Sequence, residues 1–147
     1  MLTAPVPGVN AKLLRWRMKA RMPTRTSPAQ NVVRLARMEF GADYVDVFEG
    51  GQSLVVSYRS IADGGTQMSL GGASFSLSSW HDIVIDITIT PSRAITLKVD
   101  GSMIGTRTDL ALASTATGIL KLGAATGYPC GSLDYEIDDV MVLADPQ

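Results

Sequence analysis

Hydrophobic and polar residues alternate along much of the chain, most clearly between residues 80 and 105. Isoleucine occupies every second position from 83 to 89, with aspartate, valine and threonine between. A period of two places the apolar side chains on one face of a β-strand. The alternation returns over residues 95–99 and ends at Asp100-Gly101, a dipeptide suited to the positive φ angles of a hairpin turn. These residues therefore predict consecutive β-hairpins.

Further strands are predicted on both sides of this region. Most of the earlier ones are separated by glycine-containing connections such as Gly41-Ala42-Asp43, which are typical of turns. The total is about ten or eleven strands, at the spacing of a β-sandwich. Besides the two strands above and a short one at 103–105, the predicted strands are residues 12–22, 31–40, 44–49, 54–59, 67–70, 74–77, 119–123 and 131–143.

Residues 12–22 combine an apolar face with a basic face. Strict alternation favours a strand that ends at Pro23, although three apolar residues four positions apart leave open a basic amphipathic helix of the membrane-surface type. The apolar positions are Leu14, Trp16, Met18, Ala20 and Met22. The opposite face carries Arg15, Arg17, Lys19 and Arg21, here called the basic ladder.

Two motifs in the second half resemble the LamG-like jelly-roll domains of the concanavalin A-like lectin/glucanase superfamily. The first is Trp80-His81, the alternating strand, L-K-V-D-G at 97–101 and the short strand at 103–105. The second is I-L-K-L-G at 119–123, followed by G-S-L-D-Y-E-I-D-D-V at 131–140. The resemblance implies an all-β jelly-roll sandwich of two antiparallel sheets. It implies no single activity, because one fold hosts many functions.

The 147 residues fit one domain, with a core that needs no disulfide or metal. Residues 1–11 are rich in proline and small residues and predict an extended N-terminal arm, followed by a single sandwich domain over residues 12–147. The lone cysteine, Cys130, excludes an intramolecular disulfide. The chain start lacks a secretion signal, and no apolar run is long enough to cross a membrane, so we expect synthesis in a cytoplasm without export.

Charge is distributed unevenly along the chain. Residues 1–38 carry a formal +8, whereas residues 39–147 carry −9, from five basic and fourteen acidic side chains. The basic ladder must therefore face water, an acidic surface or a polyanion. We predict that Arg15, Arg17, Lys19 and Arg21 bind an acidic protein surface, on another copy or on a capsid or tail protein. Nucleic acid is disfavoured, because no aromatic residues for base stacking are interleaved with these cations.

The segment Glu136-Ile137-Asp138 resembles the start of the E-x-D-x-x-E strand motif of laminarinase-like glucanases. Retaining glycosidases need two carboxyl groups that divide the roles of acid and nucleophile. Here Val140 and Met141 occupy the positions where the third acid would fall. The sequence therefore predicts no catalytic residues and no enzyme.

The single histidine, His81, excludes a histidine-rich metal site. A Ser-His-Asp set that uses Asp82 or Asp86 is not excluded by counting, although adjacent strand residues point to opposite faces. We expect no cofactor and assign no metal ligands. Calcium stays open, because loop carboxylates can bind it. Its candidate ligands are Asp43, Asp46, Asp63, Asp109 and Asp134.

Carbohydrate binding in lectin-like sandwiches uses exposed aromatic side chains. Trp16 and Trp80 occupy apolar positions and are predicted to lie in the core, which leaves Tyr128 as the candidate glycan contact, within loops around residues 63–72 and 126–131. The sequence thus predicts a non-enzymatic structural or interaction protein in a homo-oligomer or larger assembly. The expected setting is a virion, as a phage capsid decoration or tail protein. The alternative is a carbohydrate-binding module.

Overall fold

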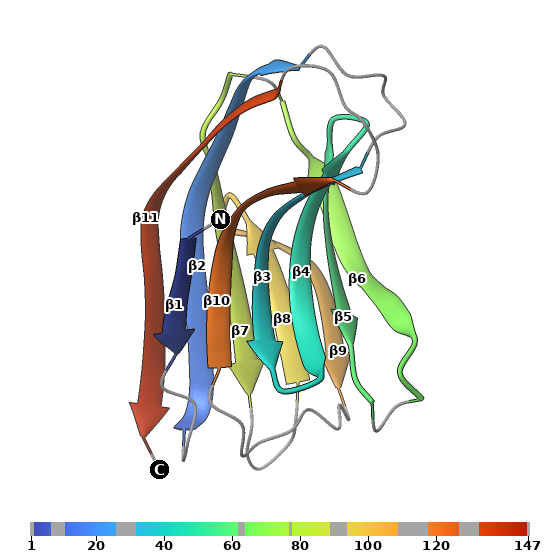
Figure 1. The fold of residues 1–147 in the computed structure, drawn as a ribbon, viewed down its shortest axis with the longest axis vertical. Coiled ribbons are helices and arrows are strands. Elements are labelled where there is room, and N and C mark those ends of the chain that lie inside the picture. The colour runs from blue at the N-terminus through green and yellow to red at the C-terminus, as the bar shows by residue number, and fades with distance from the viewer. Residues whose placement is uncertain are drawn as a thin grey trace.

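The computed structural model describes residues 2–6, 11–25, 32–61, 64–76, 78–88, 94–108, 118–126 and 133–146. These residues form eleven strands in two sheets that face each other (Figure 1). All paired strands in the described residues are antiparallel. The predicted all-β sandwich of two antiparallel sheets is confirmed. None of the described residues forms a helix with the length and hydrophobicity needed to span a membrane.

One sheet, here called the front sheet, lies nearer the viewer in Figure 1. Its strands, in order across the sheet, are β1 (Leu2–Val6), β10 (Gly118–Thr126), β3 (Val32–Phe40), β4 (Asp43–Gly50), β5 (Ser53–Arg59) and β6 (Gln67–Ser74). The other sheet, the back sheet, has the order β11 (Leu133–Pro146), β2 (Ala11–Arg25), β7 (His81–Thr88), β8 (Ala94–Val99) and β9 (Ser102–Thr108).

Most predicted strands match observed ones, and three details differ. The β2 segment is a strand, so the helix alternative is wrong, and it continues through Pro23 to Arg25. One strand, β6, covers the strand predicted at 67–70 and runs through Gly71-Gly72 to Ser74, whereas Phe75 and Ser76 of the strand predicted at 74–77 lie outside any strand. Residues 2–6 of the expected arm form β1, which pairs with β10. The hairpin turn is as predicted, because Asp100 and Gly101 have φ angles of 50° and 79°.

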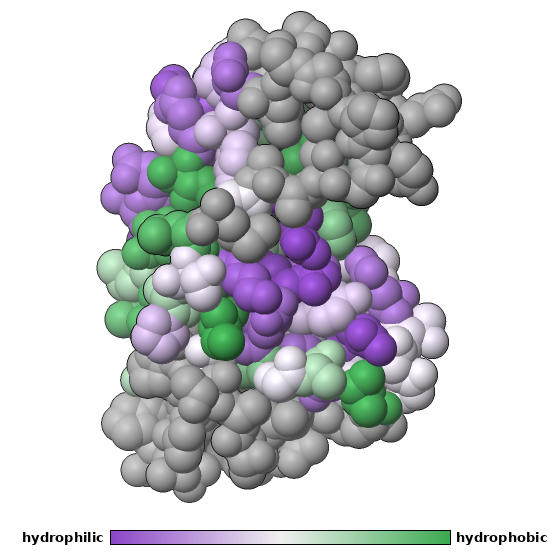
Figure 2. All heavy atoms as spheres, viewed as in Figure 1, coloured by the Kyte–Doolittle hydropathy of each residue, from purple (hydrophilic) through white to green (hydrophobic). Residues whose placement is uncertain are grey.

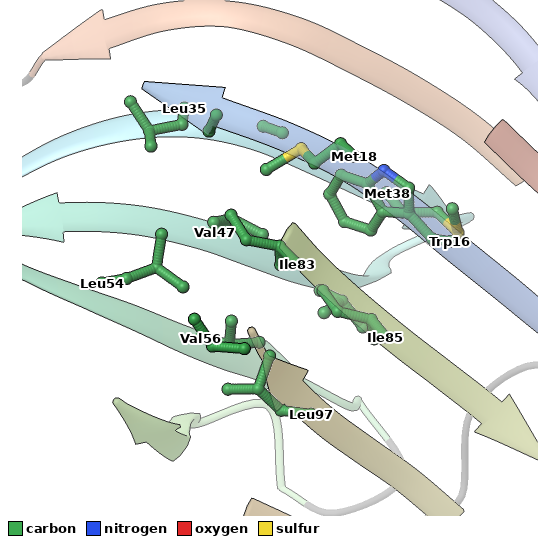
Figure 3. Close-up of a cluster of buried hydrophobic side chains, with 14 of the residues drawn as sticks. Trp16, Met18, Leu35, Met38, Val47, Leu54, Val56, Ile83, Ile85 and Leu97 are labelled. Atoms are coloured by element: carbon green, nitrogen blue, oxygen red, sulfur yellow. The ribbon is translucent and has the colours of Figure 1, made fainter. Parts of the chain in front are cut away.

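The core consists of apolar side chains that alternate along the strands of both sheets and meet between them (Figure 3). The five apolar positions of β2 are fully buried, with Trp16 at 1% exposure. They pack with residues such as Met38 of β3, Val56 of β5 and Ile85 of β7. The period of two in the sequence therefore gave the correct inward face of these strands.

The two sheets approach closely where their edge strands β6 and β9 meet. A Cβ atom on Gly105 would lie 2.1 Å from the carbonyl oxygen of Leu70, and one on Gly71 would lie 3.1 Å from the carbonyl oxygen of Ile104. A side chain at Gly105 would thus overlap backbone atoms of the opposite sheet. The glycine allows these two edges to pack together.

A tyrosine connects the sheets elsewhere. The hydroxyl of Tyr135, on β11 of the back sheet, donates a hydrogen bond of 3.0 Å to the carbonyl oxygen of Leu35 on β3 of the front sheet. The pairing of β3 with β4 shifts register between Arg34 and Ala36, at this carbonyl. The irregularity in β3 therefore coincides with the residue that accepts the bond between the sheets.

Candidate functional site

The structure brings the four residues of the basic ladder together on the outer face of the back sheet, and each has an acidic partner. The partners come from β7 and β11, the two strands that flank β2. The ion pairs are Arg15–Asp86 at 2.6 Å, Arg17–Asp82 at 2.8 Å, Lys19–Asp139 at 2.5 Å and Arg21–Glu136 at 2.5 Å.

These pairs neutralise the ladder within its own sheet. Hydrogen bonds to the partner carboxylates raise the pKa values of Arg15, Arg17 and Lys19. The hydrogen bond from Lys19 in turn lowers the pKa of Asp139. Docking of the ladder on an acidic neighbour stays a prediction. It would require the neighbour's carboxylates to replace those already bound.

The acidic segment at residues 136–139 of β11 makes its contacts within the back sheet, at whose edge β11 lies. Glu136 accepts hydrogen bonds from the guanidinium of Arg21, and Asp138 accepts one of 2.8 Å from the backbone N–H of Asp139. The strand pairing shifts register between Asp138 and Met141, and Asp139 has a φ angle of 50°. Across this irregularity Glu136, Asp138 and Met141 pair with alternate residues of β2, so the position of the third acid in the glucanase-like motif lies on the same face but holds a methionine.

His81 contacts a serine and an aspartate, but not the aspartates weighed in the sequence. Its Nδ1 lies 2.8 Å from Oδ2 of Asp100, and its Nε2 lies 3.1 Å from Oγ of Ser76. This is the order of contacts found in serine hydrolases. The same Nε2 also lies 3.4 Å from the carbonyl oxygen of Ser76, and Asp100 accepts the backbone N–H of Asp82.

These contacts fit a structural role. A hydrolase also needs free N–H groups to bind an oxyanion. Near Ser76, the backbone N–H groups of Phe75 and Ser78 already donate to carbonyl oxygens of Gln52 and Met22. The histidine therefore ties the Asp100 hairpin turn to the start of β7 and to the segment after β6.

The calcium candidates do not gather in the part of the chain that the structure describes, where no three acidic, histidine or cysteine side chains cluster. Asp43 is buried and accepts the backbone N–H of Ile61 at 2.7 Å, and Asp46 is buried against Arg37. Asp134 lies on β11. The other two candidates, Asp63 and Asp109, lie outside the described residues.

The aromatic residues follow the predictions only in part. Trp16 is buried as expected, but the prediction for Trp80 is wrong, because it is 40% exposed. Trp80 lies just before β7, outside the strand whose alternation placed it in the core. The guanidinium carbon of Arg21 lies 4.8 Å from the centre of its ring. Tyr128, the predicted glycan contact, lies outside the described residues.

A groove on the outer face of the front sheet includes Gln67 and Ser69, which lie in the segment 63–72 predicted to bind glycan, but the sequence reasoning missed its other lining residues. Figure 2 shows this face, with hydrophilic side chains gathered near its middle. The groove has a volume of about 600 Å³. Its lining residues are Val32, Phe48, Gly50, Gly51, Val55, Ser57, Gln67 and Ser69.

Strand register explains the composition of the groove. Phe48 of β4 and Val55 of β5 are directly opposite each other, so their outward side chains are neighbours. Val55 in turn faces Gly72 of β6, which has no side chain to cover it. Further along β5 and β6, the amide of Gln67 donates a hydrogen bond of 2.7 Å to the hydroxyl of Ser57. The groove thus combines an aromatic and aliphatic surface with amide and hydroxyl groups.

Charged side chains form a network beside the groove. Arg37 donates two hydrogen bonds to the buried carboxylate of Asp46, at 2.6 and 2.5 Å, and the hydrogen bonding raises the pKa of Arg37. Lys121 donates to Glu39 at 2.7 Å. The ring of Tyr44 lies 3.8 Å from the guanidinium carbon of Arg37. These contacts hold the side chains of the central strands in place.

A signal for the groove exists in the sequence. The outward positions of β4 and β5 include Phe48 and Val55, where the alternation calls for polar residues. Only the strand order shows that these two exceptions lie side by side.

Comparison with family models and with curated proteins gives no match for this chain. Solved structures do match. The receptor-binding domain of botulinum neurotoxin type G has 10% sequence identity and a TM-score of 0.68, over 99% of this chain and 41% of that chain. That of botulinum neurotoxin D has 11% identity and a TM-score of 0.70, over 97% of this chain and 36% of that chain. This chain thus spans well under half of those structures. At such identities the likeness shows a shared fold, the β-sandwich.

Proposed function

We propose that this protein is a non-enzymatic binding domain that holds a carbohydrate in the groove of the front sheet. The observation that supports this most directly is the apolar surface of Phe48 and Val55 beside the polar groups of Ser57, Gln67 and Ser69. Sugars present an apolar C–H face that packs on aromatic rings, and hydroxyls that need hydrogen-bonding partners. A site with mostly apolar lining and a few convergent polar groups is typical of small-ligand recognition.

Two further observations support a binding role. The structural neighbours carry titles that name them as receptor-binding domains, which is a property of those proteins. The second is the LamG-like resemblance, which stays a prediction. Many domains of the resembled superfamily bind glycans.

The experiment measures binding of the purified chain to a panel of bacterial and plant polysaccharides, with calcium and with chelator, while released sugar is monitored. Phe48→Ala should weaken binding by about 1 kcal/mol or more, as expected for one stacked aromatic ring. Val84→Ala is the matched control, because Val84 is a partly buried, outward apolar residue on β7 of the back sheet. The Val84→Ala variant should bind the polysaccharide with the same affinity as the unmodified protein.

Three results would contradict the proposal or its site. Absence of binding to every polysaccharide contradicts carbohydrate recognition. Loss of binding in Trp80→Ala or Tyr128→Ala, with none in Phe48→Ala, moves the site away from the groove. Release of sugar contradicts the non-enzymatic role, and loss of binding with chelator assigns calcium to the site.

A role in a larger assembly is the second candidate, and a capsid decoration or tail protein on a virion is its most specific form. It is supported by apolar side chains exposed on the back sheet, namely Met103 at 66%, Met141 at 47% and Leu143 at 52%. Large exposed apolar side chains near a sheet edge favour protein contacts. Light scattering tests this candidate, and a strictly monomeric chain at high concentration would contradict self-assembly.

A further inference from the structure

Building on the proposed carbohydrate function, we propose that the groove selects an acidic saccharide and that Arg34 binds its carboxylate. The class of ligand is a sugar chain that contains a carboxylated unit, such as a uronic acid or a sialic acid. The inference depends on two observations. Arg34 lies beside the groove, and the other cations on this face already have hydrogen-bonding partners.

Arg34 is placed beside the aromatic part of the groove. It lies on β3, directly opposite Phe48 of β4, and both side chains point outward. Residues in this relation have Cβ atoms about 4.5–5.5 Å apart. Arg34 is partly buried, which allows its aliphatic stem to pack along the sheet while the guanidinium reaches the solvent. A sugar ring on Phe48 would bring its substituents within reach of this guanidinium.

The other cations on this face already have partners. Arg37 is bound to Asp46, and Lys121 to Glu39. The guanidinium of Arg59 donates to the carbonyl oxygen of Gly65 at 2.8 Å. Within the described ranges, by contrast, no acidic side chain pairs with Arg34. Its planar guanidinium, which matches a carboxylate with two parallel hydrogen bonds, is available to a ligand.

The charge balance of the face agrees with an anionic ligand. Among the outward side chains that the structure describes on the front sheet, Glu39 and Asp46 are the acids. Four cations oppose them: Arg34, Arg37, Arg59 and Lys121. The excess is positive and lies next to an uncharged groove, which favours a ligand that brings its own negative charge.

The test compares acidic saccharides with uncharged counterparts of the same shape. Calorimetry measures oligogalacturonate against its methyl ester, and sialyllactose against its carboxyl methyl ester. We expect at least one acidic saccharide to bind about tenfold or more tightly than its neutral counterpart. This is the gain in affinity expected from a hydrogen-bonded pair of opposite charges. Arg34→Gln should reduce that preference to within about twofold, and thermal unfolding checks that the variant is folded.

Three further variants separate the roles. Arg34→Lys keeps the charge but not the paired hydrogen bonds, so it should retain only part of the preference. Phe48→Ala should weaken the binding of both the acidic saccharide and its neutral counterpart. Lys98→Gln, a half-buried outward cation on β8 of the back sheet, is the control and should keep the full preference.

The outcomes distinguish this inference from the function on which it rests. Equal binding of acidic and neutral saccharides, or an unchanged preference in Arg34→Gln, overturns the role of Arg34 and leaves carbohydrate binding intact. Absence of binding to every acidic saccharide also overturns the role of Arg34. Absence of binding to all polysaccharides, including the neutral ones, overturns the proposed carbohydrate-binding function as well.

Discussion

Tyr135 shows how one side chain joins the two sheets. Its ring packs against the core, and its hydroxyl reaches the carbonyl oxygen of Leu35 in the other sheet. Burial raises the pKa of Tyr135 to about 12, although a hydrogen bond from the Gly123 backbone partly opposes the shift. The sequence could not predict this contact, because it depends on which carbonyl the irregularity in β3 presents.

Tyr135→Phe should destabilise the fold by about 1 kcal/mol near neutral pH, since the buried carbonyl loses its donor. The folded pKa lies above the ordinary value near 10, so the tyrosine's contribution is complete below pH 10 and declines as the pH rises through 12. Urea unfolding measures the first effect, and tyrosinate absorbance measures the second. Tyr44→Phe is the control, because the hydrogen bond that its hydroxyl donates to Gln67 is long, at 3.4 Å. Equal losses in both variants would contradict this role for Tyr135.

Local patterns predicted most elements but not their partners. Alternation over β2, β7 and β8 follows from one buried face, and the Asp100-Gly101 turn follows from its positive φ angles. The division of β6 into two strands was wrong, because Gly71-Gly72 was interpreted as a turn. In the structure, one of these glycines lies where β6 meets β9. A glycine pair in a sequence does not distinguish a turn from a close packing contact.

Gly105→Ala tests the contact between β6 and β9. A methyl group there would overlap the backbone oxygen of Leu70, so one edge must move, at a cost of about 3 kcal/mol. Gly50→Ala is the control, because its methyl would lie 3.3 Å from a methyl of Val32, which can adjust. Urea unfolding compares the two. A similar small effect in both variants would mean that the two edges pack less closely than described.

At the scale of the molecule, folding pairs the basic start of the chain with the acidic remainder. The sequence showed this imbalance and suggested a partner to neutralise it. The structure pairs the ladder with carboxylates of β7 and β11, 65 to 120 residues away. Single-sequence patterns carry no information on such distant pairing. Most of the groove was missed for the same reason, since its walls come from β3, β4 and β5 as well as from β6, which lies largely in the predicted segment 63–72.

The ion pairs predict a pH dependence of stability. Lys19 lowers the pKa of Asp139, so the unfolded state binds a proton more readily than the folded state. The stabilisation is therefore present above the ordinary pKa near 3.9 and is lost as the pH falls through the lower folded value. Asp139→Asn should be less stable than the unmodified protein at pH 6, and the difference should vanish in strong acid. Asparagine tolerates the positive φ angle at this position, so it is a conservative replacement.

Thermal unfolding of both proteins across this range gives the measurement. A difference in stability that stays constant with pH would mean that the Lys19–Asp139 pair contributes nothing.

The pairing of β1 with β10 and of β2 with β11 has a consequence for synthesis on the ribosome. The strands β1 and β2 remain without these neighbours until β10 and β11, which come much later in the sequence, have been made. Until then, β2 exposes backbone groups along one side. Contacts between distant residues also slow folding, because a long loop must close first. Neither sheet is complete before β10 and β11 have been made, and until then the unpaired edges of the earlier strands are sites where the nascent protein can aggregate.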